Sequence, residues 1–402
     1  MKIKINKGRA SGSLTAPPSK SMAHRMLISA ALADGVSTVR GISSCEDVKA
    51  TLDCLSAFGI EYKASGGDVT VYGKRPELIK PISSLFCRES GSTLRFLIPI
   101  AMASGQTAVF YGEGGLMSRP MSVYEELFVK KGLTYISDGE SIVVKGPLSG
   151  GEYSLPGNIS SQFISGLLFV LPTLASDSVI KIAPPIESRS YIDLTISALK
   201  SFGVVCEWCD EYTISVKGNQ SYKASDVSVE GDYSGSAFLE ALNLFGADVS
   251  VEGLNPDSIQ GDRVYKKYFD MLRCGTPNIH IGDCPDLGPI LFAVAAAKHG
   301  GIFTGTKRLK IKESDRAAAM ADELKKFGTS VSIYDDTVVI YPADFHAPCE
   351  VLSGHNDHRI VMALAVLLTL VGGEINGAEA VSKSYPEFFE SLSALGIEVT
   401  RI

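Results

Sequence analysis

The stretch Leu52-Asp-Cys-Leu55-Ser-Ala-Phe58-Gly59 joins apolar residues at helical spacing to a glycine. Apolar residues three positions apart share one helix face, and a glycine after a helix adopts positive φ without a Cβ clash. The pattern recurs along the chain, and its copies end at Gly59, Gly132, Gly203, Gly275, Gly328 and Gly396. Intervals of 73, 71, 72, 53 and 68 residues separate these glycines, so the sequence predicts six repeated units.

A second series of helices alternates with the first and begins at small polar or acidic residues. Its members open at Ser19-Lys20-Ser21, Glu89-Ser90-Gly91-Ser92, Ser160-Ser161-Gln162, Asp232-Tyr-Ser234, Asp286-Leu-Gly288 and Asn356-Asp357-His358. Ser, Asp and Asn at these positions accept hydrogen bonds from the first amides of a helix. Each unit is therefore predicted to run helix, strand, helix, strand, strand, which gives about twelve helices, six buried and six amphipathic. The short fourth interval predicts a trimmed unit near Pro277.

The last unit ends one strand short, at residue 402, and the alternating N-terminal segment 2–6 is the natural strand to complete it. A single core rarely grows beyond roughly 250–300 residues. We therefore expect an α/β protein of two domains with three units each. Residues 19–229 would form one domain, and residues 1–18 plus 230–402 the other, with hinge crossovers near 15–19 and 228–232.

The composition of the chain limits the classes of partner that we expect it to bind. The chain has 38 Lys+Arg and 45 Asp+Glu, a net charge of −7, so we expect no nucleic-acid partner. The longest apolar run, residues 360–371, is too short to span a bilayer of about 30 Å, so we expect no membrane partner. The N-terminus lacks the apolar stretch of a signal peptide, which predicts a cytoplasmic location. We also expect a monomer.

Basic residues gather where helices are predicted to begin. They are Lys20, Arg25, Arg95, Arg119 and Arg189 in the first half and Lys312, Arg316, Arg359 and Lys383 in the second. Solvent exposure would explain any one of them. A cation at a helix N-terminus is opposed by the helix dipole unless an anion joins it. Recurrence in six units therefore predicts bound anions, which Arg recognises through its planar fork of donors.

The sequence gives little support for a metal site or a nucleotide-binding site. His355-Asn-Asp-His358 has a metal-like i, i+3 spacing, but nothing in the sequence obviously completes a ligand set, so we expect no metal. Satisfied or exposed imidazoles explain the pair as well. The chain also contains no G-x-x-x-x-G-K-[ST], no G-x-G-x-x-G opening a helix and no G-x-S-x-G, and we expect no cofactor.

Seven motifs, in order along nearly the whole chain, resemble those of the 5-enolpyruvylshikimate-3-phosphate (EPSP) synthase family of enolpyruvyl transferases. They are Ser19-Lys20-Ser21-x-x-x-Arg25, Glu89-Ser-Gly91-Ser-Thr-x-Arg95, Arg119-Pro120-Met121, Ser160-Ser161-Gln162-Phe163, Lys312-Glu313-Ser-Asp315-Arg316, Asn356-Asp357-His358-Arg359 and Lys383-Ser-Tyr-Pro386. The resemblance implies a two-domain inside-out α/β barrel. It also implies transfer of the enolpyruvyl group of phosphoenolpyruvate to the 5-hydroxyl of shikimate 3-phosphate, with release of phosphate through a tetrahedral intermediate.

By motif position, the resemblance assigns phosphoenolpyruvate to Lys20, Gly91, Arg119, Gln162, Arg316, Arg359 and Lys383. It assigns shikimate 3-phosphate to Lys20, Ser21, Arg25, Ser160, Ser161, Gln162, Ser188, Tyr191, Asp286 and Lys312. The reaction needs a base near the hydroxyl and an acid near the methylene carbon. Asp286 is the candidate base and Glu313 the candidate acid, with Lys20 a candidate shared proton carrier. Glu313 would need a raised pKa to donate a proton at neutral pH.

Two departures from the family pattern and two alternative functions remain open. Glu89 and Arg308 stand where the family often has Asn, so one substrate contact is expected to differ. Gly91 is retained, so we expect glyphosate to compete with phosphoenolpyruvate. The alternative enzyme is UDP-N-acetylglucosamine 1-carboxyvinyltransferase, which uses a loop cysteine as acid, and the comparable loop 111–119 has none. A non-catalytic six-repeat binding module would instead carry a continuous basic stripe.

Overall fold

The computed structural model describes residues 1–402 and divides the chain into two compact units. Unit 1 comprises Met1–Ser19 and Gly231–Ile402, and unit 2 comprises Lys20–Glu230. Each unit has its own buried apolar core. The two segments of unit 1 are hydrogen-bonded where they approach the unit boundary, because Asp232 N donates to Pro17 O at 2.7 Å.

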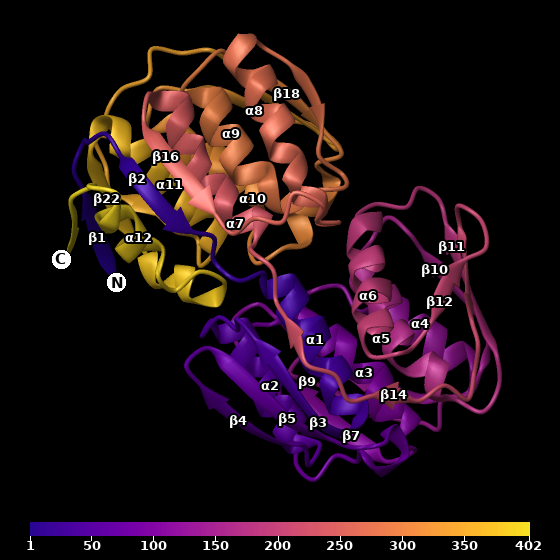
Figure 1. The fold of residues 1–402 in the computed structure, drawn as a ribbon. Coiled ribbons are helices and arrows are strands. Elements are labelled where there is room, and N and C mark those ends of the chain that lie inside the picture. The colour runs from indigo at the N-terminus through magenta and orange to yellow at the C-terminus, as the bar shows by residue number, and fades with distance from the viewer. The chain divides into compact units, whose positions relative to one another are not determined.

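Unit 2 contains six α-helices and three separate sheets (Figure 1). The helices are α1 (Lys20–Leu32), α2 (Glu46–Ala57), α3 (Gly91–Ala103), α4 (Ser122–Lys130), α5 (Ser161–Val170) and α6 (Arg189–Ser201). The first sheet has the order β14-β3-β5-β4, from Tyr222–Lys223, Ala33–Arg40, Asp68–Gly73 and Glu61–Ser65, and β15 (Val227–Ser228) also pairs with β3. The second has the order β6-β7-β9-β8, from Leu85–Phe86, Thr107–Tyr111, Ser141–Lys145 and Thr134–Ser137. The third has the order β10-β11-β13-β12, from Gly151–Pro156, Ser178–Ala183, Thr213–Val216 and Cys206–Trp208.

Unit 1 also contains six α-helices and three sheets. The helices are α7 (Tyr233–Glu240), α8 (Tyr265–Cys274), α9 (Gly288–Ala296), α10 (Arg316–Lys325), α11 (His358–Val371) and α12 (Phe388–Ala394). One sheet has the order β17-β18-β20-β19, from Asn278–His280, Gly301–Thr304, Thr337–Ile340 and Val331–Ile333. Another has the order β21-β22-β1-β23, from Leu352–Ser353, Gly373–Asn376, Lys2–Ile5 and Val399–Arg401. The last pairs only β16 (Asp248–Glu252) with β2 (Ser11–Thr15).

Five sheets share one topology. In each, the first two strands of the order are parallel and the next two pairings are antiparallel. In the sheet of β21 and β22, the third position is filled by β1, where the other sheets use the second strand of a local hairpin. The N-terminal strand thus completes the last unit. The two-stranded β16–β2 sheet is the trimmed fourth unit.

Helices alternate between two degrees of burial. The odd-numbered helices are buried on almost all sides, and in α11 every residue from His358 to Thr369 is buried. The even-numbered helices leave one face exposed, as α8 does. Each buried leucine contributes roughly 1.5–3 kcal/mol, so these helices hold each unit together. The predicted set of six buried and six amphipathic helices is confirmed. No helix has the length and apolarity needed to cross a membrane.

The N-terminal caps of the helices and the glycines that follow them agree with the prediction from the sequence, with exceptions. Ser90, Ser160, Asp232 and Asp357 cap their helices through side-chain oxygens, but α9 begins after Leu287 without such a cap. Five of the six repeat glycines have φ between 71° and 88°. The expectation is wrong for Gly275, whose φ of 166° is extended. Here α8 leads directly into β17 of the next sheet, so no hairpin requires a left-handed cap.

Candidate active site

In unit 2, two guanidinium groups lie beside the first residue of α3. A Cβ on Gly91 would come within 2.9 Å of Arg119 Nη1 and 3.0 Å of Arg95 Nη1. Glycine therefore leaves room for both cations at a helix start, where backbone amides also favour anions. Arg119 precedes a helix, as the sequence predicts, but the helix does not begin at Pro120. It is α4, which begins at Ser122.

Gln162 connects the start of α3 to the start of α5 through hydrogen bonds. Its Oε1 accepts a hydrogen bond from Arg95 Nη1 at 2.7 Å, and its Nε2 donates to Ser92 Oγ at 2.9 Å. Ser160 caps α5 by accepting from the Gln162 amide at 3.3 Å. Arg95 therefore connects Gln162 with the helix start at Gly91, where Arg119 also lies, and Ser160 joins the group through the Gln162 amide.

Lys20 is the first residue of α1 and is ion-paired within unit 2. Its Nζ donates to Asp47 Oδ2 at 2.7 Å, and both side chains are largely buried. The next residue, Ser21, offers its carbonyl to Arg25 Nη1 at 2.6 Å. Lys20 is thus held in place but has a carboxylate partner with which a substrate anion must compete.

Arg25 is more deeply buried than a simple surface anion site would require. Its Nε donates to Thr195 Oγ1 at 2.8 Å and its Nη2 to Tyr191 O at 2.9 Å. Burial lowers the pKa of Arg25 to about 10. Ser188, whose carbonyl accepts from the Tyr191 amide, precedes α6 in a left-handed conformation with φ 57°. Arg25, Tyr191 and Ser188 therefore form one buried cluster.

Arg189 lies outside these clusters although it begins α6. Its guanidinium carbon stacks 3.9 Å from the Trp208 ring centroid, and its Nη1 donates to Glu211 O at 2.8 Å. The position of a cation at a helix start was therefore a misleading signal here.

In unit 1, Arg316 is the centre of a buried ion-pair cluster. Its Nε donates to Asp357 Oδ2 at 2.8 Å, its Nη1 to Asp286 Oδ1 at 2.8 Å and its Nη2 to Glu313 Oε2 at 2.7 Å. The side chain is 1% exposed. Burial lowers the pKa of Arg316, but the charges of Asp357, Glu313 and Asp286 outweigh it, so the pKa lies well above its usual value.

Asp286 is surrounded by cations. It accepts a hydrogen bond from Lys312 Nζ at 3.0 Å as well as from Arg316, and its Oδ2 lies 3.7 Å from Arg359 Nη2. Burial lowers the pKa of Lys312, and the positive charges of Arg316 and Arg308 add to this effect while Asp286 opposes it. Asp286 therefore lies within 4 Å of three cations.

Arg359 and Lys383 complete the predicted cations of unit 1. The Nε and Nη1 atoms of Arg359 are buried and have no hydrogen-bond partner in the protein. Lys383 Nζ donates to Asn356 O at 2.6 Å. Lys383 does not begin a helix as predicted, because it is the last residue of the 3₁₀ helix η7 (Ala378–Lys383).

Two acidic residues near this cluster were missed as site candidates. Asp357 appeared in the sequence only as a helix cap, and it is also a direct partner of Arg316. Asp262 gave no sequence signal. Burial and then the charge of Asp286 raise the pKa of Asp262 to about 6. In unit 2, Arg95 carried a motif signal but no assigned role.

The two departures from the family pattern lie close to backbone. Glu89 packs its carboxylate against Gly114, where an added Cβ would be 2.5 Å from Glu89 Cδ. Arg308 is 6% exposed and donates from Nη1 to Gly282 O at 3.3 Å. The charge of Arg308 also acts on Lys312, an assigned site residue.

The histidine pair does not gather metal ligands. His355 Nε2 lies 3.0 Å from Glu323 Oε1, and His358 is buried in α11. The structure holds no group of three or more His, Cys, Asp or Glu side chains that could bind a metal ion.

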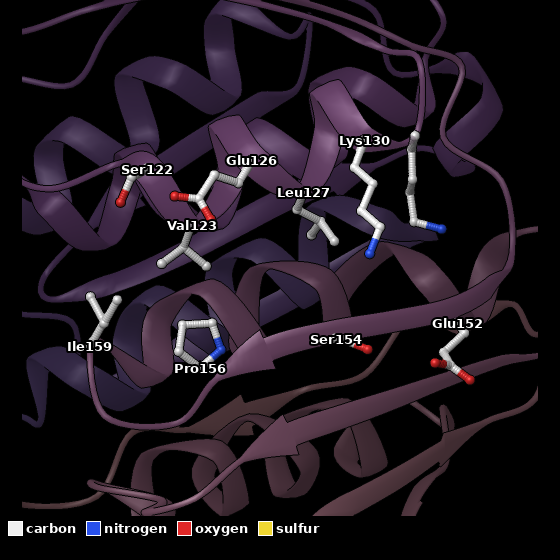
Figure 2. Close-up of a pocket in the computed structure, with 10 residues that line it drawn as sticks. Ser122, Val123, Glu126, Leu127, Lys130, Glu152, Ser154, Pro156 and Ile159 are labelled. Carbon is white, nitrogen blue, oxygen red and sulfur yellow. The ribbon is translucent and has the colours of Figure 1, made fainter.

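A groove of about 460 Å³ lies apart from these clusters in unit 2. Figure 2 shows side chains of α4 and β10 lining it, among them Glu126, Lys130 and Glu152. None of the predicted site residues lines the groove. Its volume alone is therefore a poor guide to the chemistry.

Solved structures with the same fold define the class of protein. Two structures of EPSP synthase from Acinetobacter baumannii each match with a TM-score of 0.81 and cover 100% of both chains, at 25% and 23% sequence identity. The fold, together with the clustered cations, places the chain among the two-domain α/β enolpyruvyl transferases.

Sequence comparisons narrow the class to one family. The family model described as EPSP synthase (3-phosphoshikimate 1-carboxyvinyltransferase) matches residues 5–392. A 3-phosphoshikimate 1-carboxyvinyltransferase of Clostridium kluyveri is 37% identical over 423 residues, covering 99% of this chain and 98% of the relative. One from Clostridium acetobutylicum is 40% identical over 419 residues, with the same coverage. The chain belongs to the EPSP synthase family.

Proposed function

We propose that this chain transfers the carboxyvinyl group of phosphoenolpyruvate to the 5-hydroxyl of shikimate 3-phosphate and releases phosphate. The reaction is a step of the shikimate pathway toward chorismate and the aromatic amino acids. Family membership supports the activity. The single structural observation that carries it is Arg359, with two buried donor atoms that no protein group accepts. A buried unmet donor costs about 1–3 kcal/mol, so an anionic ligand is the natural acceptor.

In unit 2, the proposed phosphoenolpyruvate ligands are Lys20, Gly91, Arg119 and Gln162. The proposed ligands of shikimate 3-phosphate are Lys20, Ser21, Arg25, Ser160, Ser161, Gln162, Ser188 and Tyr191. The link from Arg95 through Gln162 to Ser92 supports the first assignment, because it holds Gln162 beside Gly91. Lys20 exchanges its bond with Asp47 for one with substrate.

In unit 1, Arg316, Arg359 and Lys383 bind phosphoenolpyruvate, and Asp286 and Lys312 bind shikimate 3-phosphate. Arg316 already binds three carboxylates, so the substrate anion competes with them for its donors. Glu313 is then released from its 2.7 Å bond with Arg316.

The proposed chemistry uses these residues in the following roles. Asp286 removes the proton of the 5-hydroxyl as its oxygen attacks carbon 2 of phosphoenolpyruvate, while Glu313 protonates the methylene carbon. Lys20 is a shared proton carrier in this scheme. The resulting tetrahedral intermediate loses phosphate and a methyl proton, which restores the double bond. Arg and Lys side chains stabilise the charge of the departing phosphate.

Phosphate release tests the proposal directly. Purified protein mixed with phosphoenolpyruvate and shikimate 3-phosphate should release phosphate only when both are present. Turnover with UDP-N-acetylglucosamine in place of the shikimate would contradict the proposal and favour the alternative enzyme. Binding of either anion without turnover would favour a binding module.

We further propose that the chain works as a monomer in the cytoplasm. All eight cysteines are free, and three of them are exposed, which suits a reducing compartment. Light scattering should then give a mass near 42.8 kDa with and without substrates. A mass of twice that value would contradict the monomer.

A further inference from the structure

Glu323 is a buried carboxylate of unit 1 that has no part in the chemistry proposed above. It lies on α10 and is 2% exposed. Its Oε1 accepts hydrogen bonds from Lys326 Nζ at 3.0 Å and His355 Nε2 at 3.0 Å. Its Oε2 accepts from Lys326 Nζ at 2.9 Å and the Ser353 amide at 3.0 Å. Burial raises the pKa of Glu323, but these donors outweigh it, so the pKa is lowered and the side chain is ionised.

Two of these donors, Ser353 and His355, belong to the segment Ser353–Asp357, which contains a strained turn. Asp357 N donates to Gly354 O at 2.9 Å, which closes a four-residue β-turn. Its central residues, His355 and Asn356, have φ of 49° and 53°. Positive φ at both central positions defines a type I′ turn, which strongly favours glycine and asparagine. His355 is therefore held in a conformation that its own side chain disfavours.

Helix α10 holds this turn at both ends. Arg316, its first residue, binds Asp357 at the end of the turn. Glu323, seven residues later, binds Ser353 and His355 at its start. Residues seven apart lie on the same helix face, so one face of α10 is hydrogen-bonded to both ends of the segment.

The same turn contacts two cations that are assigned to phosphoenolpyruvate, Lys383 and Arg359. Lys383 Nζ donates to the carbonyl of Asn356, the second central residue of the turn. Arg359 follows two residues after the turn, and its amide donates to Asp357 Oδ1 at 2.9 Å. Rotation of the 355–356 backbone toward negative φ would therefore move the Asn356 carbonyl away from Lys383 and shift the start of α11.

We propose that Glu323 is a positioning residue for phosphoenolpyruvate binding, which acts by holding the Ser353–Asp357 turn in its strained form. The inference rests on the proposed function, because it concerns the same substrate. Glu323 touches no substrate itself. Its effect passes through His355 and Ser353 to Lys383 and Arg359.

The Glu323→Gln variant is the first test, with Asp322→Asn as the matched control on the same helix. Asp322 is exposed, so its variant should behave like wild type. Glu323→Gln should raise KM for phosphoenolpyruvate about tenfold and leave KM for shikimate 3-phosphate unchanged, because small misplacements of binding groups carry large kinetic costs. A merely structural role would lower kcat through loss of folded enzyme and leave both KM values unchanged, which would overturn the inference.

Two variants of His355 test the strain itself and keep Glu323 in place. Both His355→Ala and His355→Gly lose the bond to Glu323, but only glycine adopts positive φ without strain. His355→Ala should raise KM for phosphoenolpyruvate, and His355→Gly should stay within about twofold of wild type. Equal KM values for the two variants would overturn the inference. Failure of the proposed function is distinguishable, because wild-type protein would then release no phosphate at all.

Discussion

Arg316 Nη1 lies 2.8 Å from Asp286 Oδ1, so the cation assigned to phosphoenolpyruvate and the proposed base are bonded to each other. Asp357 and Glu313 also accept hydrogen bonds from this guanidinium, from its Nε and Nη2 atoms respectively. On the proposed assignment, substrate binding is an exchange of one set of anions for another. The cluster keeps a buried charge satisfied when no substrate is bound.

Replacing Arg316 with lysine should damage both stability and activity. The compact ammonium of lysine lacks the planar fork of donors that reaches three carboxylates around Arg316, of which Asp357 is fully buried. Arg316→Lys should lose about 3–5 kcal/mol of unfolding free energy, as measured by urea denaturation. In the phosphate-release assay, kcat/KM should fall at least about 100-fold. Arg273→Lys, an exposed pair with Asp270, is the control and should change stability by less than about 0.5 kcal/mol.

An alanine at Gly91 should affect binding far more than folding. Its Cβ would push against the movable ends of Arg119 and Arg95, not against backbone. Gly91→Ala should raise KM for phosphoenolpyruvate about tenfold, which corresponds to about 1.4 kcal/mol. Unfolding free energy should change by less than about 1 kcal/mol, because alanine suits a helix. Gly275→Ala, where no atom lies within 4 Å of the added Cβ, should behave like wild type.

Removal of the proposed base should lower turnover far more than substrate binding. Asp286→Ala takes one negative charge away from Lys312, Arg316 and Arg359 and leaves these three cations in place. We expect kcat to fall by about 10²–10⁴, the usual range for loss of a general base, with much smaller changes in the KM values. Steady-state phosphate release measures both quantities. An unchanged kcat would remove Asp286 from the role of base.

Asp262 should give the protein a pH-dependent loss of stability. Its pKa is about 6 in the folded protein against an ordinary value of 3.8, so the folded state holds the extra proton between these values. Unfolding free energy therefore falls as pH rises from about 4 to about 6, by at most about 3 kcal/mol from this group. Asp262→Asn should remove this contribution. Urea unfolding of both proteins should show that the unfolding free energy of the variant, relative to that of wild type, is higher at about pH 7 than at about pH 4.

Glyphosate should compete with phosphoenolpyruvate. The absence of a Cβ at Gly91 leaves Arg119 and Arg95 close to the helix start, where a second small anion can bind in place of the substrate. Inhibition measured at fixed shikimate 3-phosphate should weaken as the phosphoenolpyruvate concentration rises. Inhibition that is indifferent to that concentration would contradict competition.

Spacing in the sequence predicted most of the local structure. Apolar residues at helical spacing before a glycine located the helix ends, and five of the six glycines have the expected left-handed conformation. The same reasoning failed where the pattern was incomplete. Gly275 belongs to the trimmed unit, Lys383 ends a 3₁₀ helix and does not begin a helix, and the helix after Arg119 begins at Ser122 and not at Pro120.

The sequence by itself determined the six units, their caps and the residue types of the site, because helix periodicity and capping depend on residues within a few turns of each other. Only the tertiary structure decided which charges pair. Arg316 meets Asp286 and Asp357 across 30 and 41 residues of chain, and Glu323 meets His355 across 32. Such contacts depend on how buried helices pack, and no local pattern records that packing.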